Sequence, residues 1–437
     1  GPMVFGFGSL APYRNVQNFL KPKEDSFFAA FLDDAVMSAS HKDTIEAFDM
    51  FKRDSPKHGL QINYGANKTV VLLGKCEDDN DLQQRILAYT DRGIPLTNIK
   101  IHPDNGGEVN DYGYIHLGVP VGSKIYQRET LHSLVEKFIE TCKCDDILED
   151  AQSKWIYLLW VIRQKFPFWF RHMCPTITST VEATIESHLR NKFDAVLGLK
   201  SSNLVWEKAC LPTKSHGCGF GKPKDIISAA FAANVEETMN AVLNILPGTT
   251  TYMEMIHAAD EDYNAFLFPS DDIKLFVEGA RKHKGIVISA ADSLFESELL
   301  ETHDKKPDKK KTQHFYSDMI NRSRVKYMED LIQDNADDRA KAAFLSNDGS
   351  FSGAWLFSIP KDNYNTMSTS EFRIAMKLRL DIEMLTLPDK CCCASKTKIC
   401  HRGIHLFTCN EFKNFMLMRH DAIQHDMKQL ALYGANS

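Results

Sequence analysis

Two adjacent aspartates, Asp33 and Asp34, interrupt an apolar, β-compatible stretch that runs from Phe27 to Ser40. Apolar runs on both sides of an acidic pair predict a β-hairpin that holds the two carboxylates at its turn. Adjacent carboxylates repel each other, so a chain keeps them together where a cation or a group of donors compensates them. Magnesium fits this role, because it binds one or two carboxylates together with substrate phosphates. Acidic pairs at turns are also common as plain solvated residues, so the surrounding sequence has to decide.

The composition restricts the class of protein. The 437 residues are enough for about two to four domains. Apolar residues make up 43% and charged residues 25%, as in an ordinary soluble globular protein. No apolar run approaches the roughly 18 residues of a membrane helix, so we expect no membrane partner and an intracellular location, nuclear or cytoplasmic. The net charge of −6 argues against a uniformly basic nucleic-acid binder.

The hydrophobic pattern predicts an α+β fold made of five consecutive segments. These are an N-terminal segment (3–24), a mixed α and β region (25–125), a helical region (126–300), a basic connector with further helix (301–390) and a cysteine-rich end (391–437).

The region 25–125 carries the clearest local predictions. Lys42–Arg53 has the periodicity of a helix, and Lys68–Leu73 that of a strand. The apolar segment Ile115–Gly122 predicts a short strand followed by a tight turn. Asp78–Asn110 is polar and contains a turn signal, Asp-Asn-Gly-Gly.

Three motifs in this region come in one order. They are Phe31-Leu-Asp-Asp34, then Gly59-Leu-Gln-Ile-Asn63 leading into Lys68-Thr69, and then the Leu-Gly-Val-Pro turn that contains Gly118. Their order and spacing resemble motifs C, D and E of the reverse-transcriptase palm in non-LTR retrotransposons. Looser matches downstream extend the resemblance over most of residues 27–425.

The resemblance implies a partial palm, then a helical thumb and linker, and then a small zinc knuckle. It implies Mg²⁺ at Asp33 and Asp34, with Lys68 near the incoming nucleotide and Gly118 in the primer grip. RNA or DNA is then the expected partner.

The segment before the acidic pair departs from the family pattern. Two-metal nucleotidyl transfer needs a further aspartate from a separate palm strand, and the segment 3–23 shows neither that strand nor a nucleotide-pocket motif. Gly1-Pro2 looks like the remnant of a protease site, so we expect native sequence from Met3. The expectation is half a catalytic site, and a sheet whose open face is covered by the N-terminal segment, the helical region, a second copy or another protein.

Five of the eleven cysteines lie between Cys391 and Cys409, which favours one metal site in a reduced protein over a disulfide framework. Zn²⁺ takes four such ligands tetrahedrally. The preferred set is Cys391, Cys393, His405 and Cys409, which matches the Cys-X-Cys…His-X3-Cys pattern of related elements. Cys392 or Cys400 is the alternate for one of the first two, and a run of free thiols is the bland alternative.

Basic residues supply the remaining candidates. Residues 304–326 carry an excess of positive charge that includes Arg322 and Arg324, which predicts either a phosphate-binding segment or a solvated linker. Arg419 lies in a segment that resembles the start of the nuclease region of such elements, and it is a candidate phosphate contact.

Two functions follow from these patterns. The first is a reverse-transcriptase-derived protein that cannot polymerise alone, binds zinc and binds nucleic acid. The alternative is the functional C-terminal half of an RNA-directed DNA polymerase, completed by an upstream segment or a second chain.

Overall fold

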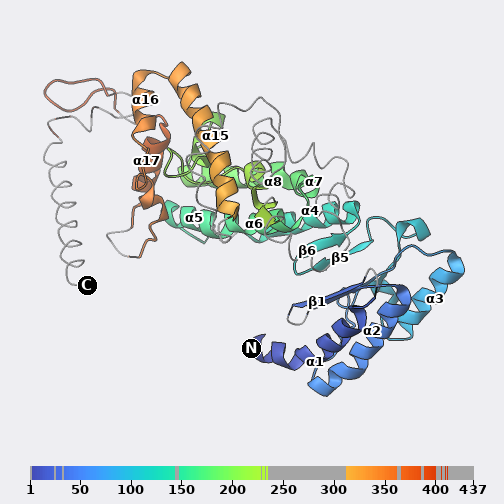
Figure 1. Cartoon of the computed structure of the whole chain (residues 1–437). Helices are drawn as coiled ribbons and strands as arrows, with labels where there is room; N and C mark the ends of the chain where they lie inside the picture. Colours follow the sequence, from blue (N-terminus) through green and yellow to red (C-terminus); the bar gives the residue numbers. More distant parts are fainter. Residues whose placement is uncertain are drawn as a thin grey trace, which may run out of the picture. The chain divides into compact units, whose positions relative to one another are not determined.

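The computed structural model describes residues 2–23, 26–31, 34–142, 147–227, 229–231, 233–234, 312–361, 366–384, 388–399, 405, 409 and 411 (Figure 1). The chain forms two compact units. The first comprises Gly1–Lys143, Gln164–His188 and Lys222–Ile320, and the second Cys144–Arg163, Leu189–Gly221 and Asn321–Ser437. The described residues form helices and three two-stranded sheets, which confirms the α+β class.

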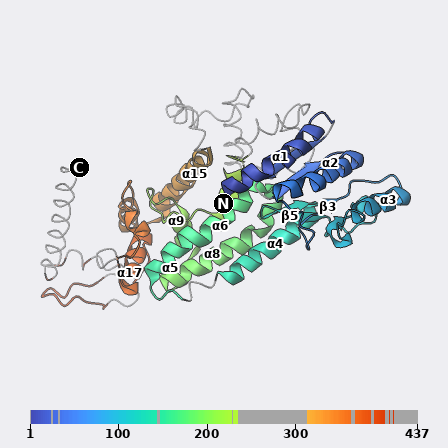
Figure 2. The same cartoon turned by 90° about the horizontal axis from the view of Figure 1, so that it is seen from below.

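The predicted hairpin is present at the start of the first unit. Strand β1 (Phe27–Phe31) pairs antiparallel with β2 (Asp34–Ser38), with Phe31 opposite Asp34. Helices α1 (Pro2–Leu20) and α2 (His41–Asp54) lie beside each other in both views (Figures 1 and 2), and α1 contacts β1.

The two helices cover one face of this hairpin. Val16 and Leu20 of α1 and Ala47 of α2 are buried against Phe28 and Met37, which lie opposite each other on the two strands. The N-terminal segment, one of the covers expected from the sequence, therefore packs on this sheet.

The first unit also contains a helix, α3 (Asp79–Thr90), that the sequence pattern did not predict. Helix α3 begins at the N-cap Asp78, whose side chain accepts the Asp81 N–H at 2.8 Å. It buries Leu82 and Tyr89 in a core shared with Phe48 and Ile99. Most residues of this stretch are polar, so its few apolar positions did not stand out as the periodic pattern of a helix.

The predicted strand Lys68–Leu73 is much shorter in the structure. Only β3 (Val71–Leu72) remains, paired in parallel with β4 (Ile99–Lys100). The buried side chain of Asn98 explains the difference, because it accepts the Asn67 N–H at 3.2 Å and donates to the Gly65 carbonyl at 3.0 Å. These bonds hold the preceding residues in a turn, and Lys68 lies exposed in that turn.

The segment with the Leu-Gly-Val-Pro motif forms a whole hairpin rather than one strand and a turn. Strands β5 (Gly113–His116) and β6 (Val119–Gly122) are joined by Leu117 and Gly118, whose φ angles are 49° and 82°. Positive φ at both positions is typical of a type I′ two-residue turn.

Helical elements fill the rest of the described chain. Outside the helices already given, they are α4 (Lys124–Thr141), α5 (Ala151–Tyr157), a π-helical turn η5 (Leu158–Ile162), α6 (Arg163–His172), α7 (Pro175–Thr178), α8 (Glu182–Leu197), α9 (Asn203–Cys210), α15 (Thr312–Asn335), α16 (Asp338–Leu345) and α17 (Thr369–Leu380). Short 3₁₀ turns occur at Ser55–His58, Leu96–Asn98, Pro103–Asn105, Ser179–Val181 and Ala354–Phe357. None of the described helices combines the length and apolar character needed to cross a membrane.

The second unit has an aromatic core. Trp155, Phe193, Trp206, Phe220 and Phe372 are buried and contact one another with ring centroids 5.2–6.4 Å apart. Both views show α17, which carries Phe372, against α5, which carries Trp155 (Figures 1 and 2).

The buried guanidinium of Arg379 on α17 secures the glycine-rich loop of this unit. It donates to the backbone carbonyls of Thr213, Gly217 and Ser352 at 2.7–2.9 Å.

Candidate metal centre

The cysteine-rich segment folds into a small looped-back turn. Lys390 pairs with Lys398, and the N–H of Cys391 donates to the Thr397 carbonyl at 2.9 Å. The N–H of Lys396, which has a φ of 48°, donates to the Cys393 carbonyl at 2.9 Å. Cys392 and Cys393 lie in a bend that leads into this turn, and successive side chains of the triplet differ in burial. Cys391 and Cys393 are buried, and Cys392 between them is exposed.

The turn brings four potential ligands together. The Sγ atoms of Cys391 and Cys409 are 3.6 Å apart, and Cys393 Sγ lies 3.5 Å from Nε2 of His405. All four ligand atoms lie within 4.8 Å of one another. A tetrahedron with Zn–S bonds of about 2.3 Å has sulfur–sulfur edges of about 3.8 Å, close to the spacing here. This Cys₃His cluster could hold a metal ion.

Hydrogen bonds prepare one of the thiols for this role. The Ser395 hydroxyl, 3.1 Å from Cys393 Sγ, lowers the pKa of Cys393 to about 5, with further bonds from the Thr397 backbone and His405. The thiolate is the form that binds metals. Burial acts in the opposite direction on Cys409 and raises its pKa.

The grouping agrees with the set preferred from the sequence, Cys391, Cys393, His405 and Cys409. Among the alternates, Cys392 points to solvent, and Cys400 lies outside the described residues. In the part of the chain that the structure describes, no other group of three or more His, Cys, Asp or Glu side chains is arranged to hold a metal.

Of the acidic pair, the structure describes Asp34. Asp34 is exposed at the first position of β2, and Asp33 lies outside the described residues. Magnesium binding at the pair therefore stays a prediction.

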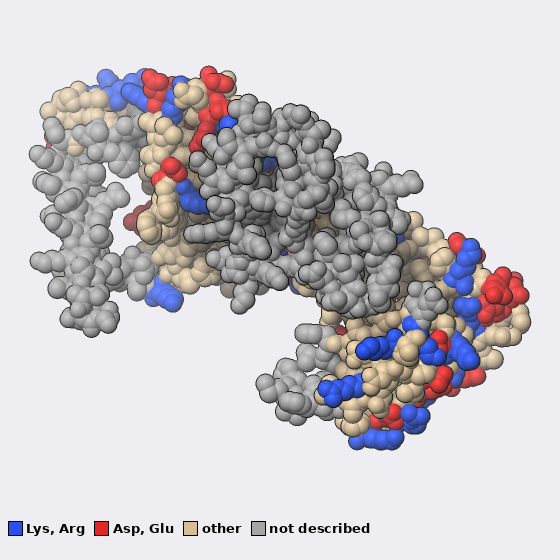
Figure 3. Space-filling view, in the orientation of Figure 1, with Lys and Arg blue, Asp and Glu red and all other residues tan. Residues whose placement is uncertain are grey.

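The basic candidates lie on two kinds of element. Arg322 and Arg324 lie on α15, and Lys68 lies in the turn before β3. Arg419 is outside the described residues. On the face seen in Figure 3, the blue and red side chains of the described residues are interspersed, so no uniformly basic surface is visible there.

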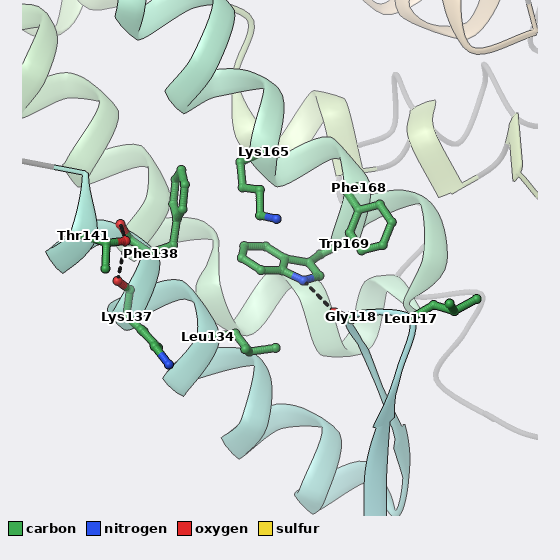
Figure 4. Close-up of a pocket in the computed structure, with 9 residues that line it drawn as sticks. All are labelled: Leu117, Gly118, Leu134, Lys137, Phe138, Thr141, Lys165, Phe168 and Trp169. Carbon is green, nitrogen blue, oxygen red and sulfur yellow. Dashed lines mark hydrogen bonds between the residues drawn. The ribbon is translucent and has the colours of Figure 1, made fainter. Parts of the chain in front are cut away.

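Gly118 lies at a cavity of about 370 Å³ within the first unit. Its lining includes the turn Leu117–Gly118, Lys137 and Phe138 of α4, and Lys165, Phe168 and Trp169 of α6 (Figure 4). The indole N–H of Trp169 donates to the Gly118 carbonyl at 3.2 Å, which fixes the turn to the helix. The sequence pattern singled out Gly118 but not the two lysines, because they are brought to it only by the packing of two helices.

No family model matches the chain, and no curated protein or solved structure matches it either.

Proposed function

We propose that this chain is a zinc-binding protein of non-LTR retrotransposon reverse-transcriptase origin that also binds RNA or DNA. The observation that carries the zinc proposal is the Cys₃His cluster, with ligand atoms at tetrahedral spacing. Thiolate and imidazole ligands together favour Zn²⁺ over hard cations such as Mg²⁺. Four protein ligands fill the coordination sphere, so the ion acts structurally and leaves no position for a substrate.

Metal analysis tests this proposal. Protein purified without chelator should contain about one zinc per chain. Cys391→Ser and Cys409→Ser should each abolish that stoichiometry, since each removes one of four ligands. Cys392→Ser is the matched control, because it changes the intervening exposed thiol and should keep the metal. Zinc contents that are equal in all three variants would refute the assignment.

Reverse-transcriptase origin rests on the order of motifs along the chain. The elements that carry these motifs are the β1–β2 hairpin with Asp34, the turn with Lys68 and the β5–β6 hairpin, in this order along the chain. The Cys₃His cluster then follows the last described helix. Lys68, Gly118, Arg322, Arg324 and Arg419 are the proposed nucleic-acid contacts.

Primer extension separates the two functional proposals. We expect no template-dependent extension by the purified 437-residue chain with Mg²⁺, because these residues supply only the acidic pair of a two-metal site. Extension that is abolished by Asp33→Ala/Asp34→Ala would establish the alternative, a polymerase. Binding of single-stranded RNA should occur either way. Arg322→Ala/Arg324→Ala should reduce the slope of log K against log salt concentration by about 1.4, since each phosphate contact on a single strand contributes about 0.7.

A further inference from the structure

The cavity beside Gly118 has features that neither zinc nor magnesium binding uses. Its walls are aromatic and aliphatic, with the rings of Phe138, Phe168 and Trp169 and the side chain of Leu117. Its charged lining residues are Lys137 and Lys165, both exposed, and no carboxylate lines it. In the described part of the chain no ion pair joins either lysine to an acidic side chain.

The conformation of Leu117 is the second, independent observation. A leucine in the left-handed region costs about 1–2 kcal/mol relative to its normal backbone, and type I′ turns prefer Asn, Asp or Gly. Burial does not compensate this cost, because Leu117 remains 47% exposed. Strain of this kind is characteristic of ligand-binding sites. Phe168, 36% exposed, continues the apolar mouth of the cavity.

The polar groups of the lining determine what can bind. The Trp169 indole N–H is bonded to Gly118, and the Thr141 hydroxyl donates to carbonyls of its own helix, Lys137 and Phe138. The N–H of Trp169 and the O–H of Thr141 therefore already donate hydrogen bonds within the protein and are not free to donate to a base edge. The hydrogen-bond donors left among the lining side chains are the ammonium groups of Lys137 and Lys165. A ligand needs an apolar body and a negative charge.

Nucleic acid fits this cavity less well than a peptide. The ammonium of Lys165 lies 5.9 and 5.6 Å from the ring centroids of Phe168 and Trp169, where it can pair with a carboxylate placed beside the rings, whereas a base stacked on these rings would have to displace it. Glu136 and Glu140, both exposed, are the sequence neighbours of Lys137 and Thr141 in α4, and these two carboxylates disfavour a polyanion more than a single acidic side chain. A short peptide needs only one apolar anchor and one adjacent carboxylate.

We propose that this cavity docks a segment of a partner protein that inserts one large apolar side chain and places an adjacent acidic residue against Lys137 and Lys165. Charge complementarity with the two lysines selects the acidic residue. The aromatic walls and Leu117 supply the anchor pocket, as buried apolar anchors do at protein interfaces. This docking does not involve the zinc cluster, and of the proposed nucleic-acid contacts it shares only Gly118.

A displayed library of random short peptides, selected on the full chain, tests the proposal. We expect enrichment of Asp or Glu next to Leu, Phe, Met or Trp. The selected peptide, labelled with a fluorophore, should bind at least about tenfold more weakly to Lys137→Glu/Lys165→Glu. Lys42→Glu/Lys200→Glu is the charge-matched control, since both lysines are exposed and outside the cavity, and it should bind like the parent.

A second variant excludes loss of folding as the cause. Leu117→Asn relieves the left-handed strain and should leave the chain at least as stable, yet it should weaken the peptide at least about fivefold because the apolar mouth is lost. The proposal would be overturned if the selected peptides showed no enrichment of an acidic residue next to an apolar one. It would also be overturned if the peptide bound Lys137→Glu/Lys165→Glu as tightly as the parent chain. Tighter binding of labelled oligothymidine that competes with the peptide would overturn it as well and would make the cavity a nucleic-acid site.

Discussion

At the scale of single residues, the buried polar side chains of Asn98 and Arg379 each determine the conformation of a nearby loop. Asn98 closes the turn before β3 and thereby shortens a strand that the apolar pattern extends to Lys68. Arg379 satisfies three backbone carbonyls of loops from distant parts of the sequence. Neither role can be read from local sequence, since both depend on partners more than 25 residues away.

The substitution Arg379→Met should destabilise the second unit by about 2–4 kcal/mol, because it leaves buried carbonyls without donors. Arg339→Met, at an exposed position of α16, is the control and should change the free energy of unfolding by less than about 0.5 kcal/mol. Urea unfolding followed by tryptophan fluorescence measures both. Equal stabilities would mean that water replaces the guanidinium without cost.

At the scale of elements, the sequence predicted what strong local patterns specify. The β1–β2 hairpin and helix α2 are where alternation and periodicity placed them. Helix α3 was missed because most of its surface is polar, and the β5–β6 hairpin was predicted only as a strand and a turn.

The Cys₃His cluster and the cavity beside Gly118 also differ in how far the sequence predicts them. The Cys₃His cluster was predictable, since its ligands lie within 19 consecutive positions of the sequence. The cavity was not, because α4, α6 and the Leu117–Gly118 turn meet only in the folded chain.

Helix α17 allows a test of local stabilisation. Ser368 and Glu371 form a reciprocal capping box at its start. Ser368→Ala should cost about 1 kcal/mol of stability. Ser370→Ala, which changes an exposed serine two positions on, is the matched control and should be close to neutral.

The capping box also predicts a pH dependence. The hydrogen bond with the Ser368 side chain, and a second with its backbone, lower the pKa of Glu371 below 4.5. A lowered carboxyl pKa stabilises the fold above the ordinary value, and this contribution is lost as the pH falls through the folded value. The stability difference between the parent chain and Glu371→Gln should therefore be constant from pH 7 to about 5.5 and shrink in more acidic solution. A difference that grows on acidification would contradict the assignment.

At the scale of the whole molecule, the division into two compact units predicts two separable unfolding transitions. The Cys₃His cluster belongs to the second unit. A zinc chelator should therefore lower the midpoint of one calorimetric transition and leave the other unchanged, since a ligand stabilises only the structure that binds it. Cys391→Ser should reproduce the chelated profile without chelator. A uniform downward shift of both transitions would show that the units unfold together.

The alternation of buried and exposed thiols in Cys391–Cys393 also affects how the segment responds to electrophiles. A reagent that modifies thiolates meets the exposed Cys392 first, whether or not a metal is bound. The sulfurs of Cys391 and Cys393 are buried, and a bound metal ion would also coordinate them, so we expect them to react only in a metal-free chain whose turn has opened. If the cluster binds a metal, we therefore expect the number of covalent adducts in this triplet to report its occupancy, with one adduct for a loaded chain and three for an empty one.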